Sequence, residues 1–422
     1  MVSLKEAVLT GIQGSDGLFM PEFIPQLDAR FIENIHQHSL QEIAFEVAKL
    51  FLNEDVAERE IQSIVKDAMN FEIPLVHLHD NVYTLELFHG PTLAFKDVGA
   101  RFMARLFAYF LKDDNQQIHI LVATSGDTGS AVAHAFWNVP NISVTILYPS
   151  GKVSLLQEKQ LTTLGGNIKA LEIEGTFDDC QRMVKQAFAD SDLQANINLA
   201  SANSINLARL IPQSFYYFWA YAQYVEKHGK SEVSICVPSG NFGNLTAGLF
   251  AKRMGLPFHQ FIAATNANDV VPQYLSTGTY TPRPSQQTIS NAMDVGNPSN
   301  FSRIMELYNC DNEAVKQDIV GYAFTDNATR TTMKDVYEKF NYTLDPHGAV
   351  GYAAVEVYQK ANPNVACIFF ETAHPAKFGD VVQDATGISP FIPERLSSLV
   401  DKEKVAIKMK ADYELLKGYL LQ

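Results

Sequence analysis

Residues 233–254 read VSICVPSGNFGNLTAGLFAKRM, in which an apolar run, a glycine-rich loop and a helical segment follow one another directly. The pattern predicts a buried strand over Val233–Val237, a loop over Ser239–Asn244 and a helix over Leu245–Met254. A strand that leads at once into a helix is the repeating unit of α/β proteins, because a parallel neighbouring strand is reached only through a crossover. This segment therefore indicates an α/β fold.

The same alternation extends over much of the chain. Upstream, the expected elements are the strands Gln117–Ala123, Ile142–Leu147 and Ile168–Ile173 and the helices Ser130–Trp137 and Val153–Leu164. Two more strands are expected at Phe261–Thr265 and Val365–Glu371. Strands that alternate with helices over about 300 residues predict two parallel-sheet, three-layer α/β domains. A cleft between the sheets, at the carboxyl ends of the strands, is the expected ligand site.

The N-terminal residues have a different pattern. Ser39–Leu52 and Glu58–Met69 carry apolar residues at helical spacing and contain no glycine, which predicts a helix-rich N-terminal unit. We expect four segments, namely this unit over residues 1–80, a smaller α/β domain over 81–204, a larger α/β domain over 205–390 and a C-terminal helical segment over 391–422.

Composition excludes several classes of function. The chain has 422 residues and a net charge of −14, which disfavours a nucleic-acid or membrane partner. Its four cysteines form no C-x-x-C pair, and the close pairs His36/His38 and His77/His79 lack a set of acidic partners at ligand spacing, so we predict no metal. Met1–Gly14 does not have the pattern of a secretory signal, and we expect a cytoplasmic protein. Whether it is a monomer or a homodimer stays open.

The loop SGNFGN has the features of an anion site. Gly240 and Gly243 allow the backbone to approach a ligand, and Asn241 and Asn244 tolerate a positive φ. The helix that follows presents unpaired N–H groups, which favour a phosphate. The alternative is a tight turn between a strand and a helix.

A second loop of this kind is TSGDTG, residues 124–129, where Ser125 and Thr128 supply hydroxyl groups at another helix N-terminus. Two such loops predict that the cleft holds two anionic groups. Neither loop matches G-x-G-x-x-G or G-x-x-x-x-G-K-[ST], so a nicotinamide dehydrogenase and a P-loop kinase are disfavoured.

Lys96 stands in an unusual setting for a lysine, since its neighbours include the apolar residues Leu93, Ala94, Phe95, Val98 and Phe102. An exposed or snorkelling amine is the plain interpretation. A buried lysine, however, has a lowered pKa, and its neutral amine is a nucleophile that forms a Schiff base. Together with two phosphate-type loops, Lys96 points to pyridoxal phosphate.

Thr372 follows the apolar strand Val365–Glu371 in the turn ETAHPAKF and therefore lies at a strand's carboxyl end. Its hydroxyl could bond a ring nitrogen of the cofactor and leave that nitrogen neutral. A turn residue that bonds its own backbone is the alternative.

Eight motifs taken together resemble threonine synthases of the bacterial and fungal type: ELFHGPTLAFKD, ATSGDTG, LQEKQ…TLGGN, SANSIN, PSGNFGNLTAGL, AATNAND, SNAMDVG and TAHPAKF. The resemblance runs from about Ser3 to Phe378, and the last forty residues carry little of the family's signal. It implies a pyridoxal phosphate enzyme of fold type II, similar to the tryptophan synthase β chain, with the cofactor in the cleft between two α/β domains.

The resemblance also implies roles for individual residues. Lys96 resembles the lysine that binds the cofactor covalently, and Thr372 the partner of the ring nitrogen. The loop that resembles the family's binding site for the cofactor phosphate consists of Gly240, Asn241, Phe242, Gly243 and Asn244. The residues that resemble the family's sites for the substrate phosphate and carboxylate are Ser125, Asp127, Thr128, Ser204 and Arg209. Asp97 is a candidate for setting the environment of the lysine, and His347 for a place near the cleft.

The implied reaction converts O-phospho-L-homoserine and water into L-threonine and phosphate, with Lys96 as the candidate for most proton transfers. Two alternatives stay open. One is a phospho-lyase that uses the same cofactor and substrate but releases 2-oxobutyrate, phosphate and ammonia. The other is a non-catalytic pyridoxal phosphate carrier or sensor.

Overall fold

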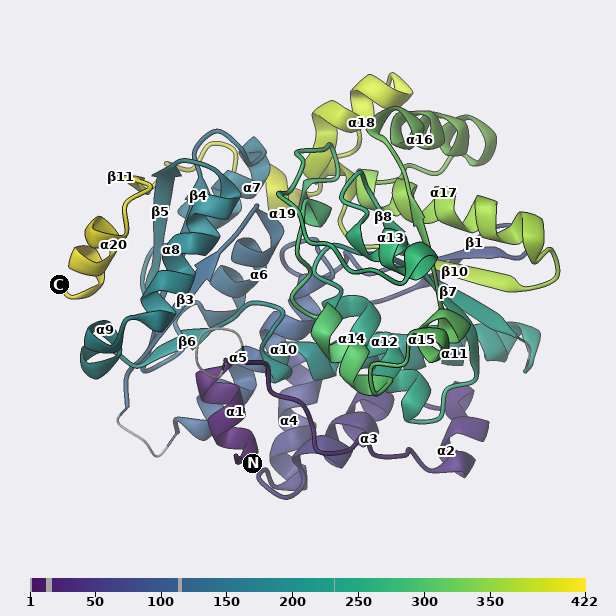
Figure 1. The fold of residues 1–422 in the computed structure, drawn as a ribbon, viewed down its shortest axis with the longest axis horizontal. Coiled ribbons are helices and arrows are strands. Elements are labelled where there is room, and N and C mark those ends of the chain that lie inside the picture. Colours follow the sequence, from purple (N-terminus) through teal and green to yellow (C-terminus); the bar gives the residue numbers. More distant parts are fainter. Residues whose placement is uncertain (1, 13–16, 113–115, 231) are drawn as a thin grey trace.

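The larger of two sheets lies in the right half of the molecule in Figure 1. The computed structural model describes residues 2–12, 17–112, 116–230 and 232–422. The six strands follow the order β1 (Leu75–His79), β2 (Val82–Glu86), β10 (Ala366–Glu371), β7 (Val233–Pro238), β8 (Phe258–Thr265) and β9 (Ile319–Ala323). All neighbouring strands are parallel except β1 and β2.

Helices cover both faces of this sheet. Alternate residues of β7 belong to different cores: Ile235 packs with α11 (Phe215–His228) and α12 (Gly243–Arg253), whereas Cys236 packs with α17 (Pro346–Ala361). A strand buried on both faces has an unbroken apolar sequence, which is why this strand could be predicted. The predicted strand, loop and helix of residues 233–254 are confirmed, although the helix begins two residues earlier, at Gly243.

The smaller sheet forms the left half of Figure 1, and all its strands are parallel. Its order is β11 (Ile407–Lys410), β5 (Ile168–Glu174), β4 (Ile142–Pro149), β3 (Ile118–Ala123) and β6 (Leu199–Ser201). Side chains of α6 (Asp127–Phe136) pack on one face and those of α8 (Phe177–Ala189) on the other. Two parallel sheets, each between helices, confirm the predicted fold class.

The N-terminal unit is helical, as predicted, and lies below both sheets in Figure 1. It contains α1 (Leu4–Thr10), α2 (Ala29–Glu33), α3 (Leu40–Leu52) and α4 (Glu58–Ala68). Ser39 and Glu42 form a capping box that begins α3. Because α4 packs against α5 (Lys96–Phe110), this unit supports the helix that carries Lys96.

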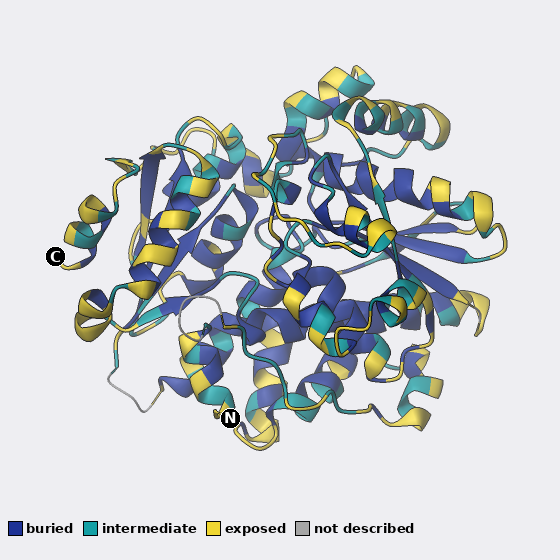
Figure 2. Ribbon diagram, viewed as in Figure 1, coloured by how far each residue is buried: buried dark blue, intermediate teal, exposed yellow. Residues whose placement is uncertain are grey.

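The other helices connect the strands or cover the outer surface, and Figure 2 shows that burial concentrates on the sheets and the helices between them. The α-helices are α7 (Leu155–Thr162), α9 (Ser191–Asn196), α10 (Leu207–Leu210), α13 (Val270–Thr277), α14 (Phe301–Leu307), α15 (Asn312–Asp318), α16 (Asp326–Phe340), α18 (Gly379–Thr386), α19 (Glu394–Ser397) and α20 (Tyr413–Leu420). The 3₁₀ helices are η1 (Ile35–Gln37), η2 (Ile211–Ser214), η3 (Asn291–Met293) and η4 (Pro375–Phe378). Over the described ranges, no helix combines the length and apolarity needed to cross a bilayer.

Sheet pairing crosses the expected segment boundaries at three places. Strand β1, from the segment expected to form the helix-rich N-terminal unit, pairs with β2 in the larger sheet. Strand β2, from the segment expected to form the smaller domain, pairs with β10 of the larger sheet. Strand β11, from the segment expected to be helical, pairs with β5 as an edge strand of the smaller sheet. The division into four segments stays a prediction, but the last segment is not purely helical.

Gly248 of α12 faces a space that is too small for a side chain. A Cβ there would lie 2.6 Å from ring carbons of the buried Phe261 and Tyr217. We expect Gly248→Ala to lower the free energy of unfolding by about 1–3 kcal/mol, because the rings must leave their packed positions. The measurement is urea unfolding followed by circular dichroism.

The matched control is Gly418→Ala in α20, where a Cβ would have no neighbour within 4 Å. This change should be neutral or stabilising, because alanine favours an exposed helix. An unchanged unfolding midpoint for Gly248→Ala would contradict the packing argument.

Candidate active site

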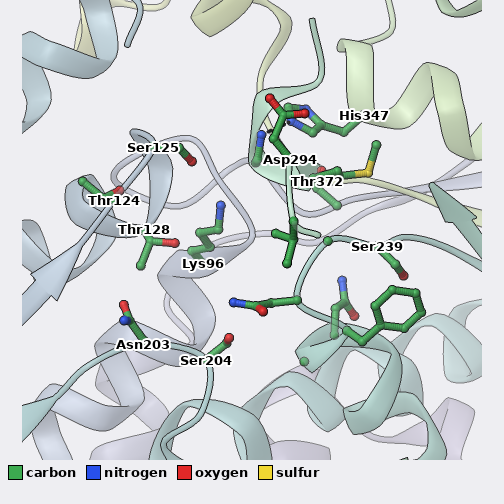
Figure 3. Close-up of a pocket in the computed structure, with 18 of the residues that line it drawn as sticks. Lys96, Thr124, Ser125, Thr128, Asn203, Ser204, Ser239, Asp294, His347 and Thr372 are labelled. Atoms are coloured by element: carbon green, nitrogen blue, oxygen red, sulfur yellow. Dashed lines mark hydrogen bonds between the residues drawn. The ribbon is translucent and has the colours of Figure 1, made fainter. Parts of the chain in front are cut away.

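A cavity lies where strands of both sheets end (Figure 3). Its lining includes Thr124 and Ser125 directly after β3, Ser239 directly after β7, and Thr372 directly after β10. Because these strands are parallel within each sheet, their carboxyl ends and the following loops converge there. The cavity therefore occupies the predicted cleft between the sheets.

Lys96 is the first residue of α5, and its side chain is only 13% exposed. Burial lowers the pKa of Lys96 to about 8, with Lys377 and Arg209 acting in the same direction and Asp127 opposing them. The amine lies 4.0 Å from Asp127 Oδ2. A large fraction of Lys96 is thus neutral near pH 8, as a nucleophilic or basic amine requires.

Asp127, which we expected to contact the substrate, lies outside the cavity lining. It lies behind the cavity, where Lys377 Nζ is 2.6 Å from Oδ1 and Gln157 Nε2 donates a hydrogen bond to the same oxygen. Although burial opposes ionisation, Lys377 and Lys96 hold the pKa of Asp127 well below its usual value. Asp127 therefore carries a fixed negative charge beside Lys96.

Asp97, expected to set the environment of the lysine, bonds elsewhere. Its carboxylate accepts hydrogen bonds from Thr92 N at 2.8 Å and from Thr92 Oγ1 at 2.7 Å. The charged neighbours of Lys96 come instead from distant parts of the chain, and Lys377 in particular was missed. Nothing in the local sequence distinguishes Lys377, the lysine of the turn TAHPAKF, from an ordinary exposed lysine.

The loop Ser239–Asn244 forms one wall of the cavity, as predicted. The left-handed residue within it is Phe242, with φ of 59°, and not Asn241 or Asn244. Asn244 lines the cavity, and its Oδ1 accepts hydrogen bonds from the hydroxyl groups of Tyr216 and Tyr217. Its Nδ2 is buried and has no hydrogen-bond partner among the described residues.

The opposite wall comes from the smaller sheet, and Figure 3 shows Ser125 and Thr128 on that side of Lys96. The turn is held by Thr124 Oγ1, which accepts hydrogen bonds from Gly126 N at 2.9 Å and Gly129 N at 2.8 Å. Gly126 adopts φ of 135°, a conformation that favours glycine. These bonds hold the backbone of the turn that carries Ser125 and Thr128 at the start of α6.

Ser204 and Arg209 also line the cavity, together with Asn203, which the sequence did not single out. Arg209 is buried, and one terminal nitrogen donates a hydrogen bond to Ala202 O at 2.7 Å. Its Nε has no hydrogen-bond partner in the described part of the chain. Burial lowers the pKa of Arg209 to about 10, so the guanidinium remains a cation near neutral pH.

Thr372 is tied directly to the segment that carries Lys96. Phe95 N donates a hydrogen bond to Thr372 O at 2.9 Å, and Ala94 forms a β-bridge with Ala373. These backbone contacts fix the spacing between the lysine and the end of β10. His347 also lines the cavity, as do Asn291 and Asp294, which the sequence did not single out.

The comparisons with known proteins cover the whole chain. The family model described as pyridoxal-phosphate dependent enzyme matches residues 71–370. The model of the threonine synthase N terminus matches residues 1–69, and that of the threonine synthase C-terminal region matches 348–420. We expected little of the family's signal in the last forty residues, and the match over 348–420 shows that expectation to be wrong.

Individual relatives agree with the family models. The threonine synthase of Haemophilus influenzae is 45% identical over 421 residues, which is 100% of this chain and 97% of the relative. The crystal structure of threonine synthase from Escherichia coli has a TM-score of 0.93 at 41% identity, over 100% of this chain and 96% of that one. A PLP-bound threonine synthase from Brucella melitensis has a TM-score of 0.91 at 36% identity, with the same coverage. This chain therefore belongs to the threonine synthase family of pyridoxal-phosphate dependent enzymes.

Proposed function

We propose that this protein is a threonine synthase, which converts O-phospho-L-homoserine and water into L-threonine and inorganic phosphate. The observation that carries the proposal is a buried lysine amine in a cavity with two anion-receptive walls, one at Gly240–Asn244 and one at Ser125–Thr128. Cofactor and substrate each bring a phosphate, and the substrate adds a carboxylate, so the reaction needs receptors of this kind. Membership of the family supports the same reaction.

The residues present fit pyridoxal phosphate. A Cβ at Gly240 would lie 2.8 Å from Ala292 O, so only glycine leaves this part of the wall open. The unpartnered Nδ2 of Asn244 is a donor that a phosphate oxygen would satisfy. Lys96 would hold the cofactor covalently, and the hydroxyl of Thr372 suits a neutral ring nitrogen. When bound, the cofactor supplies delocalisation of the negative charge that develops on the substrate carbon chain.

Lys96 is assigned the main proton transfers. With a pKa of about 8, its amine can accept the Cα proton of the substrate near neutral pH and return a proton at Cγ. An amine with an ordinary lysine pKa would be almost fully protonated there and could not act as a base. Burial of Lys96 in the wall of the cavity therefore has a direct chemical use.

The substrate's anionic groups have separate receptors in the cavity. Ser204 and the guanidinium of Arg209, whose Nε is free to donate, are assigned to the substrate phosphate. Ser125 and Thr128, at the N-terminal end of α6, are assigned to the substrate carboxylate. Two receptors at different places in the wall would orient the carbon chain across Lys96.

Lys377 and Asp127 are assigned an electrostatic role. Asp127 carries a negative charge 4.0 Å from the Lys96 amine. The Lys377 amine is closer to this carboxylate, at 2.6 Å from Oδ1. The nearby cation largely neutralises the carboxylate, which would otherwise favour protonated Lys96. Lys377 thereby keeps the Lys96 amine available.

The setting of the enzyme is part of the proposal. We assign it to the cytoplasm, with a small-molecule substrate and without a nucleic-acid or membrane partner. The net charge of −14 supports this assignment, because a broad acidic surface repels nucleic acids and acidic membranes. The described cysteines Cys180, Cys236, Cys310 and Cys367 are free thiols, which suits a reducing compartment.

The first test is product analysis by NMR after the cofactor-loaded protein is mixed with O-phospho-L-homoserine. We expect L-threonine and phosphate in equal amounts. If 2-oxobutyrate is the main product, the protein is a phospho-lyase, and if cofactor binds without any turnover, it is a carrier or sensor. Either outcome would overturn the proposed reaction.

Replacing Lys96 with Ala should reduce kcat by about 10³-fold or more, since both the covalent attachment and the base are lost. The measurement is threonine formation at saturating cofactor, with circular dichroism to confirm folding. Lys334→Ala, at an exposed lysine of α16, is the matched control and should keep full activity. Normal turnover by folded Lys96→Ala protein would remove Lys96 from its assigned role.

Replacing Lys377 with Met should raise the pKa of Lys96 above its value of about 8, because a repelling cation is lost and Asp127 becomes free to stabilise the protonated amine. The amine is neutral only above its pKa, so attachment of pyridoxal phosphate should require a higher pH, by about one unit. The measurement is the attachment rate against pH, followed by absorbance. A midpoint that stays in place or falls, relative to a Lys334→Met control, would contradict the electrostatic role.

A further inference from the structure

A chain of three titratable side chains lies buried beside the cavity and has no part in the reaction assigned above. Glu371 is the last residue of β10, Asp345 is the N-cap of α17, and His347 is the second residue of that helix. Asp345 and Glu371 are fully buried, and His347 is 2% exposed. Burying three such groups together is costly unless their protons and charges are matched, so the arrangement requires an explanation.

Hydrogen bonds determine the protonation of His347. Ala292 N, which can only donate, is 3.2 Å from His347 Nε2, so Nε2 is the acceptor and carries no proton. The ring proton is then on Nδ1, which donates to Asp345 Oδ1 at 2.5 Å. The two ring nitrogens of His347 therefore have different hydrogen-bonding roles and connect Ala292 to Asp345.

Asp345 and Glu371 share one negative charge. Burial, reinforced by the charge of Asp345, raises the pKa of Glu371 well above its usual value. Asp345 is also buried, yet His347 and Glu371 hold its pKa below the usual value. Glu371 thus holds the proton and Asp345 the charge, which is stabilised by further hydrogen bonds from the backbone N–H groups of His347 and Gly348. The acid fits only because Gly348 has no side chain, since a Cβ there would overlap Glu371 Oε1.

At the His347 end, this group of three side chains contacts η3, which packs against the loop Ser239–Asn244 in the cavity wall. Ala292 belongs to η3, and the lining includes its neighbours Asn291 and Met293. A Cβ at Gly240 would lie 2.8 Å from Ala292 O and 2.9 Å from Met293 Cα, so η3 is packed against the loop Ser239–Asn244. Figure 3 shows His347 beside Asp294 on this wall. His347 therefore holds the N–H of a residue whose carbonyl contacts the phosphate loop.

At the Glu371 end, the group of three side chains adjoins Thr372, on the side of the proposed cofactor site away from the loop Ser239–Asn244. Glu371 directly precedes Thr372, the residue assigned to the ring nitrogen, and Glu371 Oε2 accepts a hydrogen bond from Asp345 N at 3.2 Å. The three side chains thus connect the end of β10 with η3. These are the two places that would contact the ring and the phosphate of the cofactor.

We propose that Glu371, Asp345 and His347 act as one positioning unit, which sets the separation between Thr372 and the Gly240 loop by holding Ala292 N in place. None of the three exchanges a proton with the substrate. The inference rests on the proposed cofactor site but not on which product is formed.

The first test compares two replacements of His347 that keep different halves of its contacts. His347→Gln places an acceptor oxygen near the position of Nε2 and can still bind Ala292 N, whereas His347→Asn keeps a donor to Asp345 but does not reach Ala292. Titration of cofactor-free protein with pyridoxal phosphate, followed by absorbance, should give a Kd within about threefold of the parent for Gln and raised about tenfold or more for Asn. Equal Kd values for the two variants would overturn the proposal.

The second test separates positioning from catalysis. Glu371→Gln retains a side-chain oxygen that can accept from Asp345 N and should keep both cofactor Kd and kcat within about threefold, whereas Glu371→Ala should raise Kd and KM by about tenfold with kcat at saturation changed much less. Loss of kcat in Glu371→Gln at an unchanged cofactor Kd would show that the acid proton takes part in the reaction, and would overturn the proposal.

The controls keep the result interpretable. Glu356→Gln, at an exposed position of α17, should leave cofactor Kd, KM and kcat unchanged. Thermal unfolding of each cofactor-free variant checks folding, and the Gln variants still test the proposal if Asn or Ala is unstable. Because Kd is measured without turnover, a protein that forms 2-oxobutyrate would fail the proposed function while leaving this ordering of variants intact.

Discussion

A buried ion pair between Lys377 and Asp127 joins the two halves of this protein at the cavity. Lys377 follows β10 of the larger sheet, and Asp127 begins α6 beside the smaller one. Lys377 also donates to Thr92 O and Asp127 accepts from Gln157, so neither charge lacks hydrogen bonds. Separating the two groups would leave a buried charge without its partner, which is strongly destabilising. It also sets the charge that Lys96 experiences.

The backbone adds a second connection between the elements of the site. Phe95 N bonds to Thr372 O, and Ala94 pairs with Ala373, so the segment leading to Lys96 runs along the end of β10. On the other side, Gly240 leaves room for η3 to approach the loop Ser239–Asn244. Glycine, backbone pairing and buried charge thus act together to fix the dimensions of one cavity. A site held by rigid elements can orient a substrate without reorganisation, which is the main requirement of preorganised catalysis.

Much of the fold and of the site could be predicted from the sequence, and the failures have a common cause. The strands β3, β4, β7 and β10 are mostly apolar runs, because helices cover both faces of each sheet. The positive φ in the phosphate loop was assigned to asparagine, yet Phe242 adopts it, since packing within a tight loop overrides local preference. Lys377 was missed and Asp127 was given a substrate contact, because which charges pair depends on residues about 250 positions apart.

The sequence by itself determined the alternation of strands and helices, the two glycine-containing loops that line the cavity and the choice of Lys96 as the candidate lysine. These are local properties, which depend on apolar spacing, on glycine at turns and on motifs a few residues long. Only the tertiary structure decided that Asp127 lies behind the cavity, that Lys377 neutralises it, and that Glu371, Asp345 and His347 are connected by hydrogen bonds beside η3. Charges and protons are distributed by burial and by contacts between distant segments, and those exist only once the two sheets have packed together.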